Sequence, residues 1–204
     1  MNDFDARAAT WDDDPTKVER AQAIADAVVR EATLSTSMRA LEYGCGTGLL
    51  GLRLRSSVGD LTLADLSDGM LAVAQEKIAA AHDPHLRAIK LDLMTDPLPE
   101  KPYDLVFSAM TLHHIADIEG ILRRFHAVLC QRGLLCIADL DAEDGSFHGS
   151  GFDGHHGFSR EDLETKAHEA GFPDVRFSTP YEIRKEVAGR LRAYPIFLMV
   201  ARTG

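Results

Sequence analysis

Apolar residues recur at helical spacing in several segments of the chain. Positions 18, 21, 24, 25 and 28 are apolar, so the pattern predicts a helix over residues 16–32, with Pro15 near its first turn. Further helices are predicted over residues 49–55, 69–81, 117–129 and 159–170. Ser67 or Asp68, Asp117 and Ser159 stand where helix caps are expected, and Gly171 suits the end of the last helix.

Short apolar runs alternate with these helices. They predict strands over residues 38–43, 61–65, 85–91, 103–108 and 134–140. Strands that alternate with helices indicate a parallel sheet covered by helices on both faces. Residues 175–185 and 191–201 are predicted to form an antiparallel pair with a short connection around Gly189.

One segment breaks the alternation. Residues 142–158 are rich in glycine and histidine and show no periodicity, so they predict a long loop. We expect a single domain over residues 1–204. It divides into an N-terminal segment (1–37), a core (38–141), this loop, and a C-terminal helix and hairpin (159–204).

Composition narrows the class of protein. The chain has 204 residues, of which 45% are hydrophobic, and no apolar run reaches the ~18–20 residues of a membrane span. The first residues are acidic and polar, unlike a signal peptide, and three cysteines without C-x-x-C spacing suit reduced thiols, so a cytoplasmic protein is expected. A net charge of −10 with scattered basic residues argues against a nucleic-acid partner.

The stretch "EYGCGTG", residues 42–48, follows the first predicted strand directly. A strand that ends in glycines and leads into a helix presents backbone N–H groups to a ligand. Residues 46–51 spell G-x-G-x-x-G, and Asp65 lies 19 residues after Gly46, which is the dinucleotide fingerprint. Tyr181 and Lys185 also spell Y-x-x-x-K, the catalytic pair of short-chain dehydrogenases, so an NAD(P)-dependent oxidoreductase is one interpretation.

The register of the glycines favours a different ligand. The run begins at Gly44, directly after the strand, and the acidic Glu42 precedes it, which suits a cationic ligand better than a pyrophosphate. Tyr181 and Lys185 fall in a predicted strand, where residues four apart are ~13 Å from each other.

Four segments in order resemble the motifs of class I S-adenosylmethionine (SAM)-dependent methyltransferases. They are "LEYGCGTG", "LADLSDGML", "KLDLMTDPLPEKPYDLVFSAMTLHHI" and "FHAVLCQRGLLCIADL", and they cover residues 38–141. The N-terminal "FDARAATWDDDP" is similar to the lead-in segment of the small-molecule branch, of methyltransferase type 11/12. The resemblance implies a Rossmann-like, doubly wound, mostly parallel seven-stranded α/β sheet with an antiparallel C-terminal hairpin.

The same resemblance implies a set of cofactor contacts. The glycines would pass under the methionine part and ribose, Glu42 would orient the turn or the cationic end, and Asp65 would accept from both ribose hydroxyls. Leu66 and Met70 would pack on the adenine, with Asp92 and the Leu93 N–H bonding its edge. Phe4 and Trp11 could form a lid, and Arg20 could meet the cofactor carboxylate. The full predicted cofactor set is Trp11, Glu42, Gly44, Cys45, Gly46, Gly48, Asp65, Leu66, Met70, Asp92, Leu93, Ser108 and Met110.

The acceptor side carries a weaker signal. Residues 108–111, "SAMT", replace the Asn/Asp-Pro-Pro-aromatic motif of the nucleic-acid N-methylating branches, and "LHHI" resembles the small-molecule enzymes. His113 is a candidate general base, because histidine titrates near neutrality. His155 and His156, in the glycine-rich loop, are candidates for the same task. That loop could instead be a mobile surface segment or hold a metal, although its spacing matches no metal motif.

The sequence therefore predicts a SAM-dependent methyltransferase acting on a small uncharged or cationic molecule, as a monomer or homodimer. Two alternatives stay open: the NAD(P)-dependent oxidoreductase, and a SAM-binding partner protein without catalysis of its own. The identity of the acceptor and the atom that is methylated are not encoded in any motif.

Overall fold

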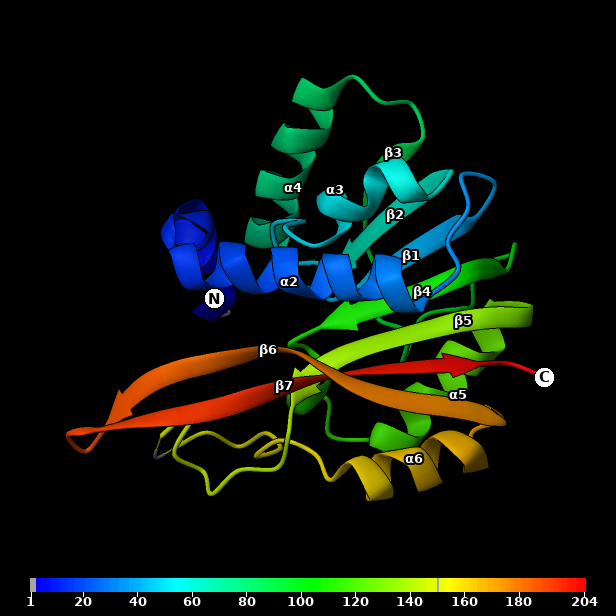
Figure 1. Ribbon diagram of the computed structural model, residues 1–204. Coiled ribbons are helices and arrows are strands. Elements are labelled where there is room, and N and C mark those ends of the chain that lie inside the picture. Colours follow the sequence, from blue (N-terminus) through cyan, green and yellow to red (C-terminus); the bar gives the residue numbers. More distant parts are fainter. Residues whose placement is uncertain (1–2, 150) are drawn as a thin grey trace.

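The computed structural model describes residues 3–149 and 151–204. A seven-stranded sheet with the order β3-β2-β1-β4-β5-β7-β6 runs through the molecule (Figure 1). Neighbouring strands β3 to β5 pair in parallel, whereas β7 is antiparallel to β5 and to β6. The strands are β1 (Arg39–Tyr43), β2 (Asp60–Asp65), β3 (Leu86–Lys90), β4 (Tyr103–Ala109), β5 (Leu129–Leu140), β6 (Asp174–Val187) and β7 (Arg190–Arg202). The predicted fold class is confirmed.

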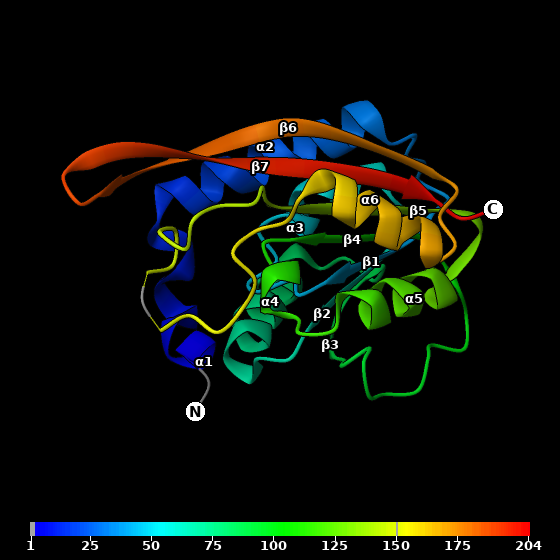
Figure 2. The same ribbon diagram turned by 90° about the horizontal axis from the view of Figure 1, so that it is seen from below.

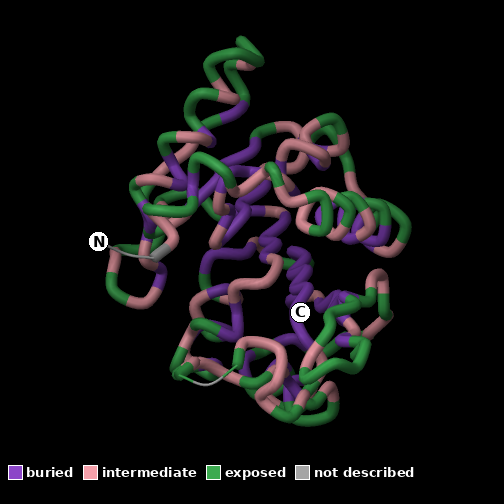
Figure 3. Tube along the Cα trace, turned by 90° about the vertical axis from the view of Figure 1, so that its left-hand side faces the viewer, coloured by how far each residue is buried: buried purple, intermediate pink, exposed green. Residues whose placement is uncertain are grey.

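Helices cover both faces of the sheet (Figures 1 and 2). One layer holds α2 (Pro15–Glu31), α3 (Gly51–Leu54) and α4 (Asp68–Ala81), which pack Ile24, Leu54 and Leu71 into one core cluster. The other holds α5 (Ile118–Val128) and α6 (Arg160–Glu169), which pack Phe125 and Leu163 into a second cluster. Figure 3 shows the buried strands between the more exposed helices. Within the described residues, no helix is long and apolar enough to cross a membrane.

The predicted caps form where the sequence places them. Ser67 accepts a hydrogen bond from the N–H of Met70, Asp117 accepts one from Gly120, and Ser159 accepts one from Asp162. These bonds satisfy backbone donors that the first turn of a helix leaves unpaired. Of the two candidates before α4, Ser67 is therefore the cap. Gly171 adopts a φ of +102° after α6, as a helix-ending glycine does.

The observed bounds differ from the predicted ones at several elements. The helix predicted over residues 49–55 is shorter, with α3 restricted to Gly51–Leu54 and a 3-10 turn, Arg55–Ser57, after it. Strand β5 begins at Leu129 rather than at 134. Two short N-terminal helices were not predicted, α1 (Asp3–Arg7) and a 3-10 helix (Ala8–Asp13). The described part of 142–158 holds no helix or strand, as expected.

The C-terminal hairpin is longer than the sheet that supports it. Strand β7 pairs with β5 only from Ile196 to Arg202, while its pairing with β6 continues back to Arg190. The far end of the hairpin therefore projects beyond the body of the sheet (Figure 2). Its tip is exposed, and Leu191 has 70% of its surface accessible.

Candidate active site

The glycine turn lies at the carboxyl end of β1, between β2 and β4. The sheet order reverses there, which is where open α/β sheets bind ligands. Gly44, Gly46 and Gly48 have φ of +70°, +54° and +81°, a left-handed conformation that glycine adopts without strain. A Cβ on Gly44 would lie 2.3 Å from the Thr111 side chain, whereas one on Gly46 would meet only Met70 Sδ at 3.9 Å. Gly46 therefore presents bare backbone toward open space.

Glu42 braces the turn from beneath. Its carboxylate is buried, and Oε2 accepts a hydrogen bond of 3.0 Å from the N–H of Gly51. A Cβ on Gly51 would lie 2.3 Å from that oxygen, so glycine is required for the close approach. Burial raises the pKa of Glu42 well above its usual value. Orientation of the turn is the predicted role of Glu42 that this geometry supports.

Asp65, at the end of β2, ties two backbone segments together. One carboxylate oxygen accepts from the N–H of Gly46 at 2.7 Å, and the other accepts from Ser67 at 2.9 Å. Each oxygen keeps a second lone pair for another donor. Leu66 beside it is 48% exposed, an unusual position for a leucine, while Met70 is buried against the turn.

Asp92, which is predicted to contact the adenine, is held in place by hydrogen bonds from nearby residues. Asp92 accepts from the Met94 N–H at 2.9 Å and from Thr95 Oγ1 at 3.0 Å, so its carboxylate caps a turn. Burial raises the pKa of the Tyr43 hydroxyl to about 12. The Asp92 carboxylate retains accepting capacity.

Three residues of the predicted cofactor set have structural contacts around the turn. Ser108 is buried and its Oγ donates to the Tyr43 carbonyl at 2.7 Å. Cys45 is buried, and burial raises the pKa of its thiol well above the usual range. Met110 follows β4 with a φ of +55°, which is rare for a residue with a side chain.

The N-terminal segment packs on the turn and on the start of α4. Thr47 Oγ1 donates to Asp12 Oδ1 at 2.6 Å, and Lys77 forms an ion pair with the same carboxylate. Asp5 Oδ1 accepts from Ser67 Oγ at 2.5 Å and from the Gly69 N–H at 3.0 Å. The N-terminal segment is thus docked on the glycine turn, and its role as a lid stays a prediction. Sequence reasoning missed these polar anchors, because nothing local marks an acid that will meet a distant turn.

Trp11 and Phe4 lie in this docked segment. Their ring centroids are 6.0 Å apart, and Lys17 Nζ sits 4.0 Å from the centroid of the Trp11 ring. Phe4 also makes an edge contact with His114 at 5.3 Å. The segment therefore connects the glycine turn to the histidines after β4.

Arg20, on α2, is partly buried with its charge uncompensated by direct contacts. Its guanidinium makes no hydrogen bond or ion pair anywhere in residues 3–149 and 151–204. Burial lowers its pKa, while the charges of Asp14, Asp139 and Tyr181 act in the opposite direction. A partly buried guanidinium without a partner suits an anionic ligand group.

His113 and Asp139 form a buried pair beside the turn. Nδ1 of His113 lies 2.7 Å from Oδ1 of Asp139, and the His113 N–H donates to Oδ2 at 3.2 Å. His113 is 2% exposed and Asp139 is fully buried. The carboxylate favours the proton on Nδ1 and leaves Nε2 as the accepting nitrogen. Sequence reasoning missed Asp139, although an acid inside the apolar run "LLCIADL" was a signal for it.

The other predicted histidines lie at different places. His155 Nε2 contacts the Ile115 carbonyl at 3.0 Å, and its ring packs on Phe158. His156 is 44% exposed, with Nδ1 3.4 Å from Glu143 Oε1. The loop instead brings His148 to His113, with ring centroids 4.9 Å apart. Across the described residues, no three histidine, cysteine or acidic side chains are arranged to hold a metal ion.

A model of a methyltransferase domain matches residues 40–133. This segment, a little under half of the chain, is similar to a methyltransferase domain. The chain is 35% identical over 97 residues to an uncharacterised methyltransferase of Mycobacterium bovis, and the alignment covers 48% of each protein. It thus spans about half the length of that relative. The predicted family resemblance is confirmed.

Two solved structures share the methyltransferase fold. A SAM-dependent methyltransferase of Thermotoga maritima aligns with a TM-score of 0.73 at 17% identity over 98% of both chains. Phosphoethanolamine N-methyltransferase 2 of Haemonchus contortus, crystallised with SAM, aligns with a TM-score of 0.72 at 18% identity. That alignment covers 88% of this chain and 52% of the other.

The oxidoreductase alternative gains no support from these comparisons. Tyr181 and Lys185 lie on strand β6, as expected. The Tyr181 hydroxyl contacts Glu19 at 3.4 Å, while Lys185 donates to the Phe147 carbonyl at 2.5 Å. Each side chain thus has its own separate partner.

Proposed function

We propose that the chain is a SAM-dependent methyltransferase that acts on a small-molecule acceptor. The observation that carries the proposal is the pairing of Asp65 with the Gly46 N–H, beside an exposed Leu66. The Asp65 carboxylate has free lone pairs that suit the hydroxyls of a ribose. The bare glycine backbone leaves room for the methionine part of the cofactor, and the exposed Leu66 side chain suits a flat base.

The residues present fit SAM at both of its ends. Asp65 and Asp92 would accept hydrogen bonds from the ribose hydroxyls and the adenine amino group. Leu66 would pack on the flat base. At the other end, the partnerless guanidinium of Arg20 would hold the carboxylate of the methionine part. When bound there, SAM supplies a methyl group on a positively charged sulfur that leaves as a thioether.

His113 is the residue proposed to move a proton. Its Nδ1 is fixed by Asp139, so Nε2 can accept the proton that an acceptor hydroxyl loses on methylation. Asp139 would stabilise the imidazolium that forms. Burial of the pair keeps water from competing for that nitrogen.

Several features support a small acceptor and a cytoplasmic setting. The net charge of −10 disfavours a nucleic-acid backbone. The Haemonchus neighbour is named for a small substrate, phosphoethanolamine. Cys45, Cys130 and Cys136 are free thiols, which is typical of a reducing compartment.

Calorimetric titration with S-adenosylhomocysteine tests the proposal, with NAD(H) and NADP(H) as parallel ligands. We expect micromolar binding of the thioether alone, and a loss of at least about tenfold in Asp65→Ala. Asp68→Ala is the matched control, because Asp68 is an exposed acid on the same connection, paired only with Lys90 at the surface. Native affinity in Asp65→Ala, or binding of a nicotinamide nucleotide alone, would overturn the assignment.

A further inference from the structure

His148 has a buried ring nitrogen that finds no partner. Within the described residues, His148 Nε2 is buried and makes no hydrogen bond. Its ring stacks on Phe152, with centroids 3.9 Å apart and an interplanar angle of 16°. The same ring lies 4.9 Å from His113 and 6.1 Å from His114. A buried polar atom without a partner costs free energy, so it calls for a ligand.

The imidazoles of His114 and His148 are uncharged at neutral pH. Burial lowers the pKa of His148 and of His114 to about 4. A neutral imidazole always has one nitrogen with a free lone pair. With Nε2 of His113, the cluster thus offers neighbouring hydrogen-bond acceptors and suits a molecule that brings donors.

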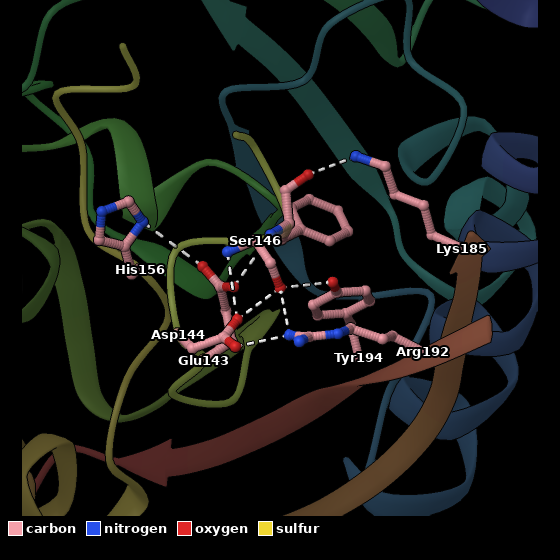
Figure 4. A network of polar contacts seen from close by, with 8 residues as sticks. Glu143, Asp144, Ser146, His156, Lys185, Arg192 and Tyr194 are labelled. Carbon is pink, nitrogen blue, oxygen red and sulfur yellow. Dashed lines mark hydrogen bonds and ion pairs between the residues drawn. The ribbon is translucent and has the colours of Figure 1, made fainter. Parts of the chain in front are cut away.

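The loop that carries His148 is fastened to the projecting hairpin (Figure 4). Arg192 on β7 donates to Asp144 Oδ2 at 2.5 Å, and Ser146 Oγ lies 2.7 Å from the Tyr194 hydroxyl. Lys185 on β6 donates to the Phe147 carbonyl at 2.5 Å. Contacts from both strands therefore fix the residues immediately before His148.

Two charged side chains lie near His148. Electrostatic effects on it come from the other histidines, Glu143 and Lys185. Glu143 Oε2 accepts from the Phe147 N–H at 2.9 Å, and Lys185 is held by the Phe147 carbonyl. Among the residues that the structure describes, the other oxygen of Glu143, Oε1, is buried and makes no hydrogen bond. An anionic acceptor would therefore be repelled there, whereas a flat apolar body could pack on Phe152 and Phe147.

A hollow opens next to the cluster. It encloses about 350 Å³ and is lined by His114, Ile115, Ala116, Asp153, Gly154 and His155. That volume is at the small end of ligand pockets and fits a molecule built on one ring.

We propose that the methyl acceptor is an aromatic molecule without a negative charge that bears a hydroxyl group, and that His148 binds it by accepting a hydrogen bond. The proposal rests on the proposed function above. The acceptor oxygen forms the new bond to the methyl carbon, the sulfur of SAM keeps the electron pair of the broken C–S bond, and the hydroxyl proton passes to His113 Nε2. His148 would determine which acceptors bind. An aromatic acceptor whose only donor is the hydroxyl next to His113 would leave Nε2 of His148 without a hydrogen bond.

A panel of acceptors tests the class. The full chain is incubated with methyl-labelled SAM and with matched rings that carry one or two hydroxyls, an amino group or a carboxylate. We expect labelled methyl ethers from the hydroxylated rings, most of all from the one with two neighbouring hydroxyls. If S-adenosylhomocysteine binds but only the amine or the carboxylate is methylated, or no hydroxylated ring is, the acceptor class is wrong and the proposed function stands. If the thioether does not bind, the proposed function itself fails.

Variants then test the role of His148. With the best hydroxylated ring, His148→Phe should raise KM about tenfold, while the affinity for S-adenosylhomocysteine stays within twofold. His148→Gln, which keeps an accepting atom, should restore most of the loss. Arg192→Ala, which frees the loop, should also raise KM, whereas Arg190→Ala at the exposed hairpin tip should not. An unchanged KM in His148→Phe would overturn the assignment of that residue.

Discussion

His113 Nδ1 lies 2.7 Å from Asp139 Oδ1, and the sheet encloses both side chains. His113 follows β4 and Asp139 lies on β5, so the pair links two adjacent parallel strands at their carboxyl ends. Asp139 also accepts from the N–H groups of His113 and Leu140. One carboxylate thus satisfies three buried donors, and its removal would leave all of them unpaired.

We therefore expect Asp139→Ala to lower the free energy of unfolding by about 3 kcal/mol or more. Urea unfolding without ligand measures the change. Asp153→Ala is the control, because Asp153 is an exposed acid of the neighbouring loop whose removal should change stability by less than about 0.5 kcal/mol. Equal urea midpoints for the wild type and Asp139→Ala would show that the pair contributes nothing to the fold.

The docked N-terminal segment gives a second prediction. The Asp12 carboxylate accepts a hydrogen bond from Thr47 Oγ1 and forms an ion pair with Lys77. Asp12→Ala should therefore release the segment from the glycine turn. We expect trypsin to cleave after Arg7 about fivefold faster, because the loss of a partly buried ion pair of about 1 kcal/mol raises the opened population by that factor. The neighbouring Asp13, which is exposed, provides the control variant Asp13→Ala. Identical cleavage rates would mean that other contacts hold the segment.

The sequence was informative where the chemistry is local. The caps at Ser67 and Asp117 lie three residues from the N–H groups that they bind, so their positions follow from spacing. Asp65 binds the Gly46 N–H from 19 residues away, and it was located through the glycine fingerprint. The predicted start of α3 was wrong by two residues: the N–H of Gly51, the first residue of the helix, binds the distant Glu42 carboxylate, which no helix pattern reveals.

Contacts made across the fold could not be predicted in this way. His148 lies beside His113 in a loop that the hairpin residues Arg192 and Lys185 fasten, and those residues are 48 and 38 residues from their loop partners in the sequence. For the same reason His155 and His156, which share the composition of the loop, have separate contacts. Histidine content identified the loop as a candidate, but tertiary contacts decide which histidine faces the cluster.

Arg20 allows a test of one end of the cofactor site. If its guanidinium holds the carboxylate of the methionine part, Arg20→Ala should weaken S-adenosylhomocysteine about 10- to 100-fold. Methylthioadenosine, which lacks that carboxylate, should bind wild type and variant within twofold of each other. Arg30→Ala on the same helix, where Arg30 is exposed and paired with Glu31, is the control. An equal loss of affinity for both ligands would show that Arg20 does not bind the carboxylate.

The lowered pKa values of His114 and His148 predict an acid-sensitive fold. Both pKa values are about 4 in the folded chain, whereas an unfolded histidine titrates near 6.5. Between these values the unfolded state binds more protons, so the stabilisation is complete above pH 6.5 and is lost as the pH falls toward 4. Because solvent reaches part of the His114 ring, we expect the two residues together to account for only about 2 kcal/mol.

Urea unfolding at pH 7.5, 6.5, 5.5 and 4.5 measures this loss. His148→Gln cannot take up a proton in the unfolded state, so its stability should fall less steeply over the same interval. The control is His82→Asn at the exposed end of α4, where asparagine tolerates the left-handed backbone and the pH dependence should follow the wild type. Parallel curves for the wild type and His148→Gln would mean that the buried ring at position 148 does not govern the acid response, and that other groups carry it.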